Sequence, residues 1–132
     1  MNVIDSSAWL EYFASGPNAA FFSEAIEKTE DLVVRTMSLY EVFKRVVQQR
    51  SENEALQAVA VMQQGNVADL DSRIALSAAR ISIDHRLPMA DSVMLATARV
   101  HNAVFWTQDS HFERIPNVRF RKSQSSASRT DC

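Results

Sequence analysis

The sequence predicts an α/β protein in which parallel strands alternate with helices. Three observations support this prediction. Short apolar runs of strand length alternate with longer segments whose apolar residues recur at helical spacing. The 132 residues suffice for one domain with a substantial core, and 46% of them are hydrophobic, as in ordinary soluble proteins. Four acidic residues from distant segments each follow or adjoin a predicted strand, where helices or turns begin.

The first quarter of the chain predicts two strands separated by two helices. Residues 1–4 are a short apolar strand, and residues 6–14 carry apolar side chains at helical offsets. The Ser-Gly-Pro sequence at 15–17 breaks this helix, and its proline suits the first position of a second helix over 17–28. Asp31 starts the next predicted strand, which continues through the apolar run at 32–34.

The middle of the chain predicts two helices and a weaker strand. Residues 38–49 place apolar side chains on one side, and residues 52–64 are mostly apolar along one face. Gly65 and Asn66 end the second helix, because both residues are favoured just past a helix end. Residues 67–70 predict a weaker strand.

The last third predicts two helices and then two strands. An Asp-Ser pair opens a helix over 71–83, and a second helix over 89–101 follows a proline. Residues 104–106 form the next strand, and residues 118–120 form a short strand at the sheet edge. This alternation implies right-handed βαβ units around a parallel sheet covered on both faces.

Composition indicates a soluble protein with one folded domain. We expect that domain to span residues 1–121, and we expect residues 122–132, which are Ser-rich and poor in apolar residues, to be a disordered tail. No apolar run reaches the length of a membrane span, and no charged leader opens the chain, so we expect a cytoplasmic protein with no membrane partner. Cys132, the one cysteine, cannot form an internal disulfide.

Glycine and histidine usage disfavours several classes of function. With only two glycines the chain has no Gly-rich loop, so neither a P-loop nor a Rossmann dinucleotide site is available. His85, His101 and His111 have no metal-ligand spacing between them, and no nucleophile–His–Asp set is evident. The net charge of −2 argues weakly against broad nucleic-acid affinity but does not exclude it, because local charge decides binding.

Four carboxylates are the strongest functional signal. In α/β proteins, ligands and catalytic groups collect outside the carboxyl ends of the strands, so acids at these positions can meet. Carboxylate oxygens suit Mg²⁺ or Mn²⁺. The residues are Asp5, Glu41, Asp91 and Asp109.

Each carboxylate also has an ordinary structural explanation. Asp5 can cap a helix, and Glu41 can form a capping box with the serine three residues earlier and an ion pair with Arg45. The dipole of its helix favours Asp91, and Asp109 suits an Asx-turn. All these explanations invoke the carboxyl edge of the sheet, so the carboxylates are expected to converge whether or not they also cap.

Four segments, taken together, resemble the PIN-domain ribonucleases and, among these, the VapC-type toxins of bacterial toxin–antitoxin pairs. Their order and spacing make the resemblance specific, and it covers roughly residues 1–121. The segments are Val3-Ile4-Asp5-Ser6-Ser7, Ser38-Leu39-Tyr40-Glu41-Val42, Leu87-Pro88-Met89-Ala90-Asp91-Ser92 with Ala96-Thr97-Ala98, and Trp106-Thr107-Gln108-Asp109.

The resemblance implies a PIN-like three-layer α/β/α sandwich with a central parallel sheet of four or five strands. It implies hydrolysis of RNA phosphodiester bonds with Mg²⁺ or Mn²⁺ as cofactor. It also implies a homodimer and a small antitoxin whose tail blocks the active site. The implied site residues are the carboxylates of Asp5, Glu41, Asp91 and Asp109, with the hydroxyls of Ser6 and Thr107 in support.

RNA binding would draw on basic residues near this edge, although a solvated surface of mixed charge is the more ordinary explanation for any one of them. The candidates are Lys44, Arg45, Arg50, Arg80, Arg86, Arg99, Arg114, Arg119 and Arg121.

One position departs from the family pattern. The family often has a second acid two residues after the fourth, whereas here His111 follows Asp109. The imidazole can weaken a second metal site, alter the choice of metal or have no effect, and we favour no effect because the main acids are intact. The alternative function is a catalytically weak or inactive PIN-like scaffold that binds RNA or a protein partner. A phosphoacceptor receiver domain is disfavoured, since no acid adjoins Asp5 and the late stretch of the chain before residue 121 contains no lysine.

Overall fold

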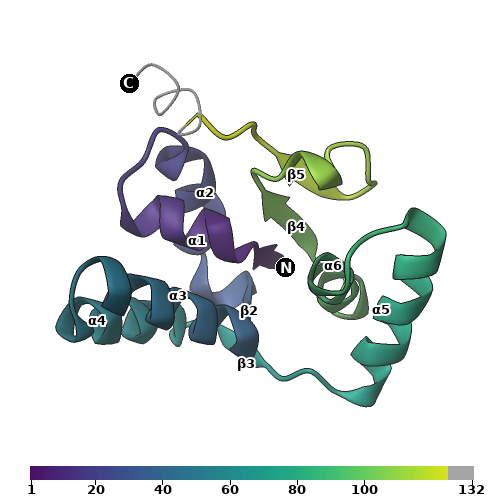
Figure 1. Ribbon diagram of the computed structural model, residues 1–132, viewed down its shortest axis with the longest axis horizontal. Coiled ribbons are helices and arrows are strands. Elements are labelled where there is room, and N and C mark those ends of the chain that lie inside the picture. The colour runs from purple at the N-terminus through teal and green to yellow at the C-terminus, as the bar shows by residue number, and fades with distance from the viewer. Residues whose placement is uncertain (125–132) are drawn as a thin grey trace.

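A five-stranded parallel sheet forms the centre of the molecule. The structure is a computed structural model that describes residues 1–124 (Figure 1). The strand order is β3-β2-β1-β4-β5, and every neighbouring pair is parallel, which confirms the predicted fold class. The strands are β1 Asn2–Ile4, β2 Leu32–Arg35, β3 Asn66–Ala68, β4 Val104–Thr107 and β5 Val118–Phe120.

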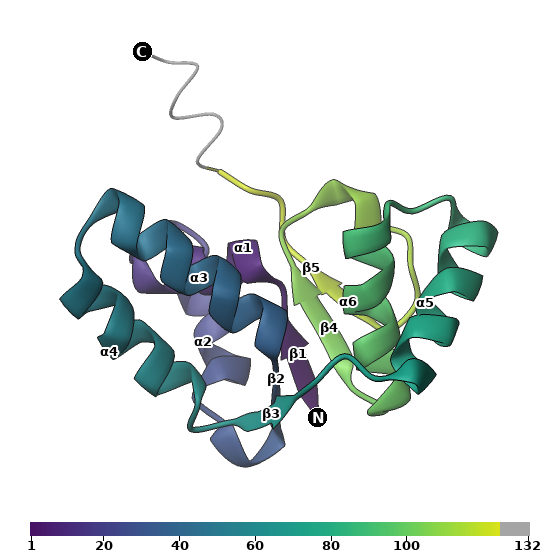
Figure 2. The same cartoon turned by 60° about the horizontal axis from the view of Figure 1, so that its bottom comes forward.

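Helices cover both faces of this sheet. Figure 2 shows α1 to α4 gathered on one side of the strands and α5 with α6 on the other. Two short 3₁₀ turns, η1 and η2, precede β2 and follow β4. The helices are α1 Ser6–Phe13, α2 Ala19–Ile26, α3 Thr36–Gln49, α4 Glu52–Met62, α5 Ser72–His85 and α6 Met89–Val100, and the turns are η1 Thr29–Asp31 and η2 Ser110–Phe112. None of the described helices is long and apolar enough to cross a membrane.

Alternation along the strands divides the core into two parts. Successive side chains of a strand point to opposite faces of the sheet, so an apolar strand contributes side chains to the core on both faces. The cluster shared with α5 and α6 contains Val3, Val33 and Phe105. The cluster shared with α1 to α4 contains Ile4, Val34 and Trp106. The three central strands are therefore held on both sides, which makes their carboxyl ends a rigid base for a site.

Strand register sets which residues lie abreast at that edge. Val3 pairs with Val33 of β2 and with Phe105 of β4. Two residues further along each strand are Asp5, Arg35 and Thr107, so the register brings these three together at the carboxyl ends of adjacent strands.

Two predicted helix starts are wrong by about half a turn. The helix predicted from residue 38 begins at Thr36, because the chain turns directly from β2 into α3. Ser38 is therefore a fully buried residue inside the helix and not its cap. The helix predicted from residue 17 begins at Ala19, with Asn18 at its N-cap.

The predicted tail begins with residues that contact the domain. Asn18 Nδ2 donates to the carbonyl of Lys122 at 3.0 Å, and Gln124 Nε2 donates to Asn18 Oδ1 at 3.4 Å. The rest of the predicted tail, residues 125–132, lies outside the described residues, so its disorder stays a prediction.

Candidate active site

A cleft of about 560 Å³ opens at the carboxyl edge of the sheet. Asp5, Glu41, Asp91 and Asp109 all line it, as does Ser6. The structure thus brings together all four carboxylates selected from the sequence, from segments up to 104 residues apart, while Thr107 lies behind them as a buried partner of Asp5.

Asp5 is the most buried of the four acids, at 5% exposure. It caps α1 by accepting the Ser7 N–H at 3.3 Å, as the ordinary explanation anticipates, and Thr107 Oγ1 donates to its Oδ2 at 2.7 Å. Burial raises the pKa of the Asp5 carboxyl, against the opposing effects of these two hydrogen bonds and of Arg35. The surroundings of Asp5 therefore disfavour the charged form of its carboxyl.

Glu41 lies in the second turn of α3, not at the helix start. Ser6 Oγ donates to Glu41 Oε1 at 2.9 Å, and Ser6 Oγ lies 3.1 Å from Ser38 Oγ. Its ion pair within the described chain is with Arg35, at 3.5 Å, and not with Arg45. Both structural alternatives expected for Glu41 are therefore wrong, and its side chain instead faces the cleft.

Arg35 is a site residue that the sequence reasoning missed. Its side chain is 8% exposed, and its Nη2 lies 3.4 Å from Ser6 Oγ and 3.5 Å from Glu41 Oε1. Burial lowers the pKa of the guanidinium, and the negative charges of Glu41 and Asp5 oppose that shift. Arg35 directly follows the apolar run Leu32-Val33-Val34, so the rule that selected the acids would have selected it too.

Asp91 and Asp109, which both line the cleft, form a tight group with His111. Asp91 lies in the first turn of α6, and Asp109 caps η2 by accepting the His111 N–H at 2.9 Å. His111 Nδ1 lies 3.3 Å from Asp91 Oδ2 and 3.5 Å from Asp109 Oδ1. The sequence shows no metal-ligand spacing between His111 and the other histidines, but in the structure His111 contacts both of these carboxylates.

The donor set of this group fits a divalent cation. One ligand atom from each of Asp91, Asp109 and His111 lies within 4.8 Å of the others. Opposite ligands of one ion lie about 4.2 Å apart when each bond is about 2.1 Å long, so shifts of a few tenths of an ångström would close the group on one ion. Asp5 and Glu41 supply further carboxylates in the same cleft.

The predicted basic residues differ in their surroundings. Lys44 and Arg45 line the cleft beside Glu41. Arg119 and Arg121 instead stack on the rings of Trp106 and Phe21, with the guanidinium carbons 4.8 Å and 4.6 Å from the ring centres. Of these candidates, Lys44 and Arg45 are the ones placed to meet a phosphate at the carboxylates.

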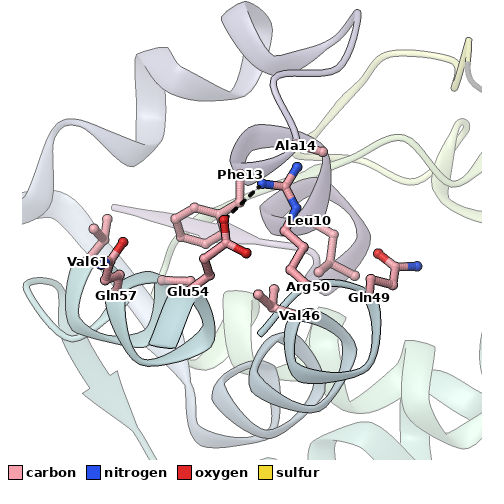
Figure 3. Close-up of a pocket in the computed structure, with 10 residues that line it drawn as sticks. Leu10, Phe13, Ala14, Val46, Gln49, Arg50, Glu54, Gln57 and Val61 are labelled. Atoms are coloured by element: carbon pink, nitrogen blue, oxygen red, sulfur yellow. Dashed lines mark ion pairs between the residues drawn. The ribbon is translucent and has the colours of Figure 1, made fainter. Parts of the chain in front are cut away.

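A second pocket lies among α1, α3 and α4 and has a different character (Figure 3). Its volume is about 280 Å³, and Leu10, Phe13 and Val61 give it an apolar wall. At its rim Arg50 Nη1 forms an ion pair with Glu54 Oε1 at 3.6 Å. Arg50, another predicted phosphate contact, is therefore already paired with a carboxylate. This pocket has no converging carboxylates, in contrast to the cleft.

Comparison with protein families matches residues 3–118 to the PIN domain. No curated protein sequence matches the chain.

Solved structures with this fold include several from toxin–antitoxin systems. A toxin–antitoxin complex from Klebsiella pneumoniae has a TM-score of 0.77 at 20% identity, covering 89% of this chain and 95% of that one. A DNA-bound VapBC from Salmonella typhimurium has a TM-score of 0.70 at 16% identity, covering 92% and 96%. VapC20 of Mycobacterium tuberculosis, described as a Sarcin-Ricin loop cleaving toxin, has a TM-score of 0.68 at 13% identity, covering 88% and 95%.

Proposed function

This chain belongs to the PIN-domain family, and we propose that it is a divalent-metal-dependent ribonuclease that hydrolyses RNA phosphodiester bonds as the toxin of a toxin–antitoxin pair. The observation that carries the proposal is the convergence of Asp5, Glu41, Asp91 and Asp109 in one cleft. RNA as substrate and a cognate antitoxin as partner draw support from structures of the same fold, which include a toxin–antitoxin complex and a Sarcin-Ricin loop cleaving toxin.

The cation would be Mg²⁺ or Mn²⁺, held by Asp91 and Asp109 with Asp5 and Glu41 as further ligands. When bound, such an ion activates water as a nucleophile and neutralises charge developing on the phosphate.

The chain's own residues orient these ligands and bind the RNA. Thr107 and Ser7 hold the two oxygens of Asp5, and Ser6 with Arg35 holds Glu41, so both carboxylates are preorganised. Lys44 and Arg45 border the acids and would bind the RNA backbone phosphates.

The first test is RNA cleavage by antitoxin-free protein with Mg²⁺ or Mn²⁺, with EDTA, and with Asp91→Asn. Structured RNAs such as tRNA belong in the substrate panel. We expect EDTA to abolish cleavage and Asp91→Asn to lower it at least about 100-fold, since the variant loses a charge that the metal requires. Asp84→Asn is the matched control, because Asp84 is an exposed acid that does not line the cleft. Equal product from wild type and Asp91→Asn would identify a contaminant and sink the nuclease proposal.

The second candidate function is a scaffold that binds RNA or a protein partner with little or no cleavage. His111, which contacts both Asp91 and Asp109, is the observation that favours it. It predicts RNA binding in a fluorescence polarisation assay at protein concentrations where no metal-dependent product forms.

A further inference from the structure

We propose that His111 is a nitrogen ligand of the metal, and that it makes this site prefer Mn²⁺ and Co²⁺ over Mg²⁺. The inference deepens the proposed function, because it rests on the same metal site and specifies the class of cation that the site selects.

The first support is geometric. The Nδ1 atom of His111 contacts both acids of the group, since it lies within 3.5 Å of one carboxylate oxygen of Asp91 and of one carboxylate oxygen of Asp109. These oxygens come from α6 and from the residue before η2, so the three ligands converge from two separate parts of the chain. A cation drawn to the two carboxylates would therefore meet the imidazole without any change of backbone.

The second support is the rigidity of the segment that carries His111. The next residue, Phe112, is fully buried, and its ring meets that of Phe105 edge-on at 4.9 Å. On the other side Asp109 caps η2, and its backbone N–H donates to Thr107 Oγ1 at 3.0 Å. The turn is thus tied at both ends, while the His111 side chain stays 61% exposed and open to an entering ion.

The third support is ligand chemistry. Mg²⁺ prefers oxygen ligands and gives up its waters reluctantly, so an imidazole adds little to its binding. Affinity of a given site for divalent first-row metals rises from Mn²⁺ to Co²⁺ and beyond, and imidazole suits the later metals of this series better than Mn²⁺, which carboxylates also suit. A site of two carboxylates and one imidazole therefore separates these metals from Mg²⁺ more strongly than carboxylates alone.

The same contacts admit one rival explanation, which predicts the opposite effect. If His111 only hydrogen-bonds the carboxylates, it competes with every cation, and its removal raises affinity for all of them. If His111 is a ligand, its removal lowers affinity for Mn²⁺ and Co²⁺ and leaves Mg²⁺ nearly unchanged. The sign of the change distinguishes the two explanations.

The experiment is calorimetric titration of metal-stripped protein with Mg²⁺, Mn²⁺ and Co²⁺ in the absence of RNA. It is run at about pH 8, because imidazole binds metals in its neutral form. Loss of even an outer partner of a metal ligand typically costs 10–100-fold in affinity, so we expect His111→Asn to weaken Co²⁺ binding at least about 10-fold. The visible absorption of bound Co²⁺ should change in the same variant. His85→Asn, which alters an exposed histidine outside the cleft, should change neither quantity.

His111→Asp completes the set by replacing the nitrogen with oxygen. We expect it to bind Mg²⁺ more tightly and to lose most of the preference for Co²⁺. The proposal is overturned if His111→Asn leaves the Co²⁺ to Mg²⁺ affinity ratio unchanged, or if it raises affinity for all three metals. In either case EDTA-sensitive RNA cleavage by the wild type would leave the proposed function standing. If the wild type binds none of the metals and EDTA has no effect on cleavage, both proposals fail.

Discussion

At the scale of single residues, the cleft depends on a buried cation among its acids. Asp5 and Glu41 face one cleft, and Arg35 offsets the charge of both. Register sets this arrangement, because the residue that ends β2 lies beside the residue that follows β1. Arg35 is thus placed to orient Glu41 before any metal binds.

Arg35→Met tests this role. The variant leaves Ser6 and Glu41 without their charged partner, so we expect a loss of about 1–3 kcal/mol in the free energy of unfolding. RNA cleavage should fall because Glu41 is no longer held. Arg35→Lys keeps the charge but lacks the planar guanidinium group. Its free energy of unfolding and its RNA cleavage should therefore lie between those of the wild type and those of Arg35→Met. Urea unfolding in EDTA and the cleavage assay measure both effects, and wild-type values for Arg35→Met in both would refute the role.

Asp5→Asn is expected to stabilise the metal-free protein while it removes activity. Burial raises the Asp5 pKa above 3.8, so folding favours the protonated carboxyl. The stability from protonated Asp5 is fully present below the unfolded pKa and is lost as pH rises through the folded pKa, so ionised Asp5 costs stability at neutral pH. Asparagine removes that cost. Thermal melts in EDTA should show a higher Tm for Asp5→Asn at neutral pH and a shrinking difference as the pH falls; an unchanged or lower Tm at neutral pH contradicts the expectation.

At the scale of elements, the connection between α1 and α2 is built around a buried acid. Glu11 is 8% exposed, and its Oε2 accepts the Asn18 N–H at 2.7 Å, which ties the end of α1 to the start of α2. Asn18 Nδ2 then reaches Gln108 Oε1, 3.0 Å away in the loop between β4 and η2. The loop that carries Asp109 is thereby fastened to the helical layer across the sheet edge.

Gly16→Ala should loosen this connection. A Cβ at residue 16 would lie 2.5 Å from the Glu11 carboxyl carbon, so the carboxylate must shift, and we expect the shift to disrupt its bond to Asn18. We expect a loss of about 1–3 kcal/mol in the free energy of unfolding. The same change in a Glu11→Ala background should cost far less, because no carboxylate then occupies the space. Equal costs in the two backgrounds, measured by chemical denaturation, would show that the contact is not the cause.

At the scale of the whole molecule, α5 carries an apolar surface with no partner in the described chain. Leu76 is 74% exposed and Ile83 is 69% exposed, and their spacing of seven residues puts them on the same face of the helix. Exposed large apolar side chains that share one face are typical of surfaces that associate. The homodimer implied by the family resemblance stays a prediction, and this face is its best candidate surface.

Leu76→Glu should therefore weaken self-association by at least about 30-fold, the loss typical of a hot-spot residue. Size-exclusion chromatography with light scattering over a range of concentrations measures it. Leu56→Glu on α4, which alters a 55% exposed leucine on the opposite layer, should leave the dimer intact. A wild-type protein that remains monomeric at high concentration would count against the dimer itself.

Most of the fold could be predicted because its signals are local. The strand at 104–106 and the edge strand at 118–120 were found within one residue, since apolar runs bounded by polar turns identify them. Asp71 caps α5 by accepting the Ile74 N–H, as predicted. The start of α3 was missed because the Ser-x-x-Glu pattern at 38–41 mimics a capping box, whereas the chain enters the helix directly from the strand.

The sequence by itself determined the parallel α/β architecture and identified the four carboxylates of the cleft, because hydrophobic period and the positions of acids are properties of neighbouring residues. Only the tertiary structure decided that Glu41 pairs with Arg35 and that His111 meets Asp91. These contacts join separate elements, and they depend on strand register and on how α3, α6 and η2 are placed over the sheet. Packing of the whole core sets those placements, and no local pattern in the sequence contains them.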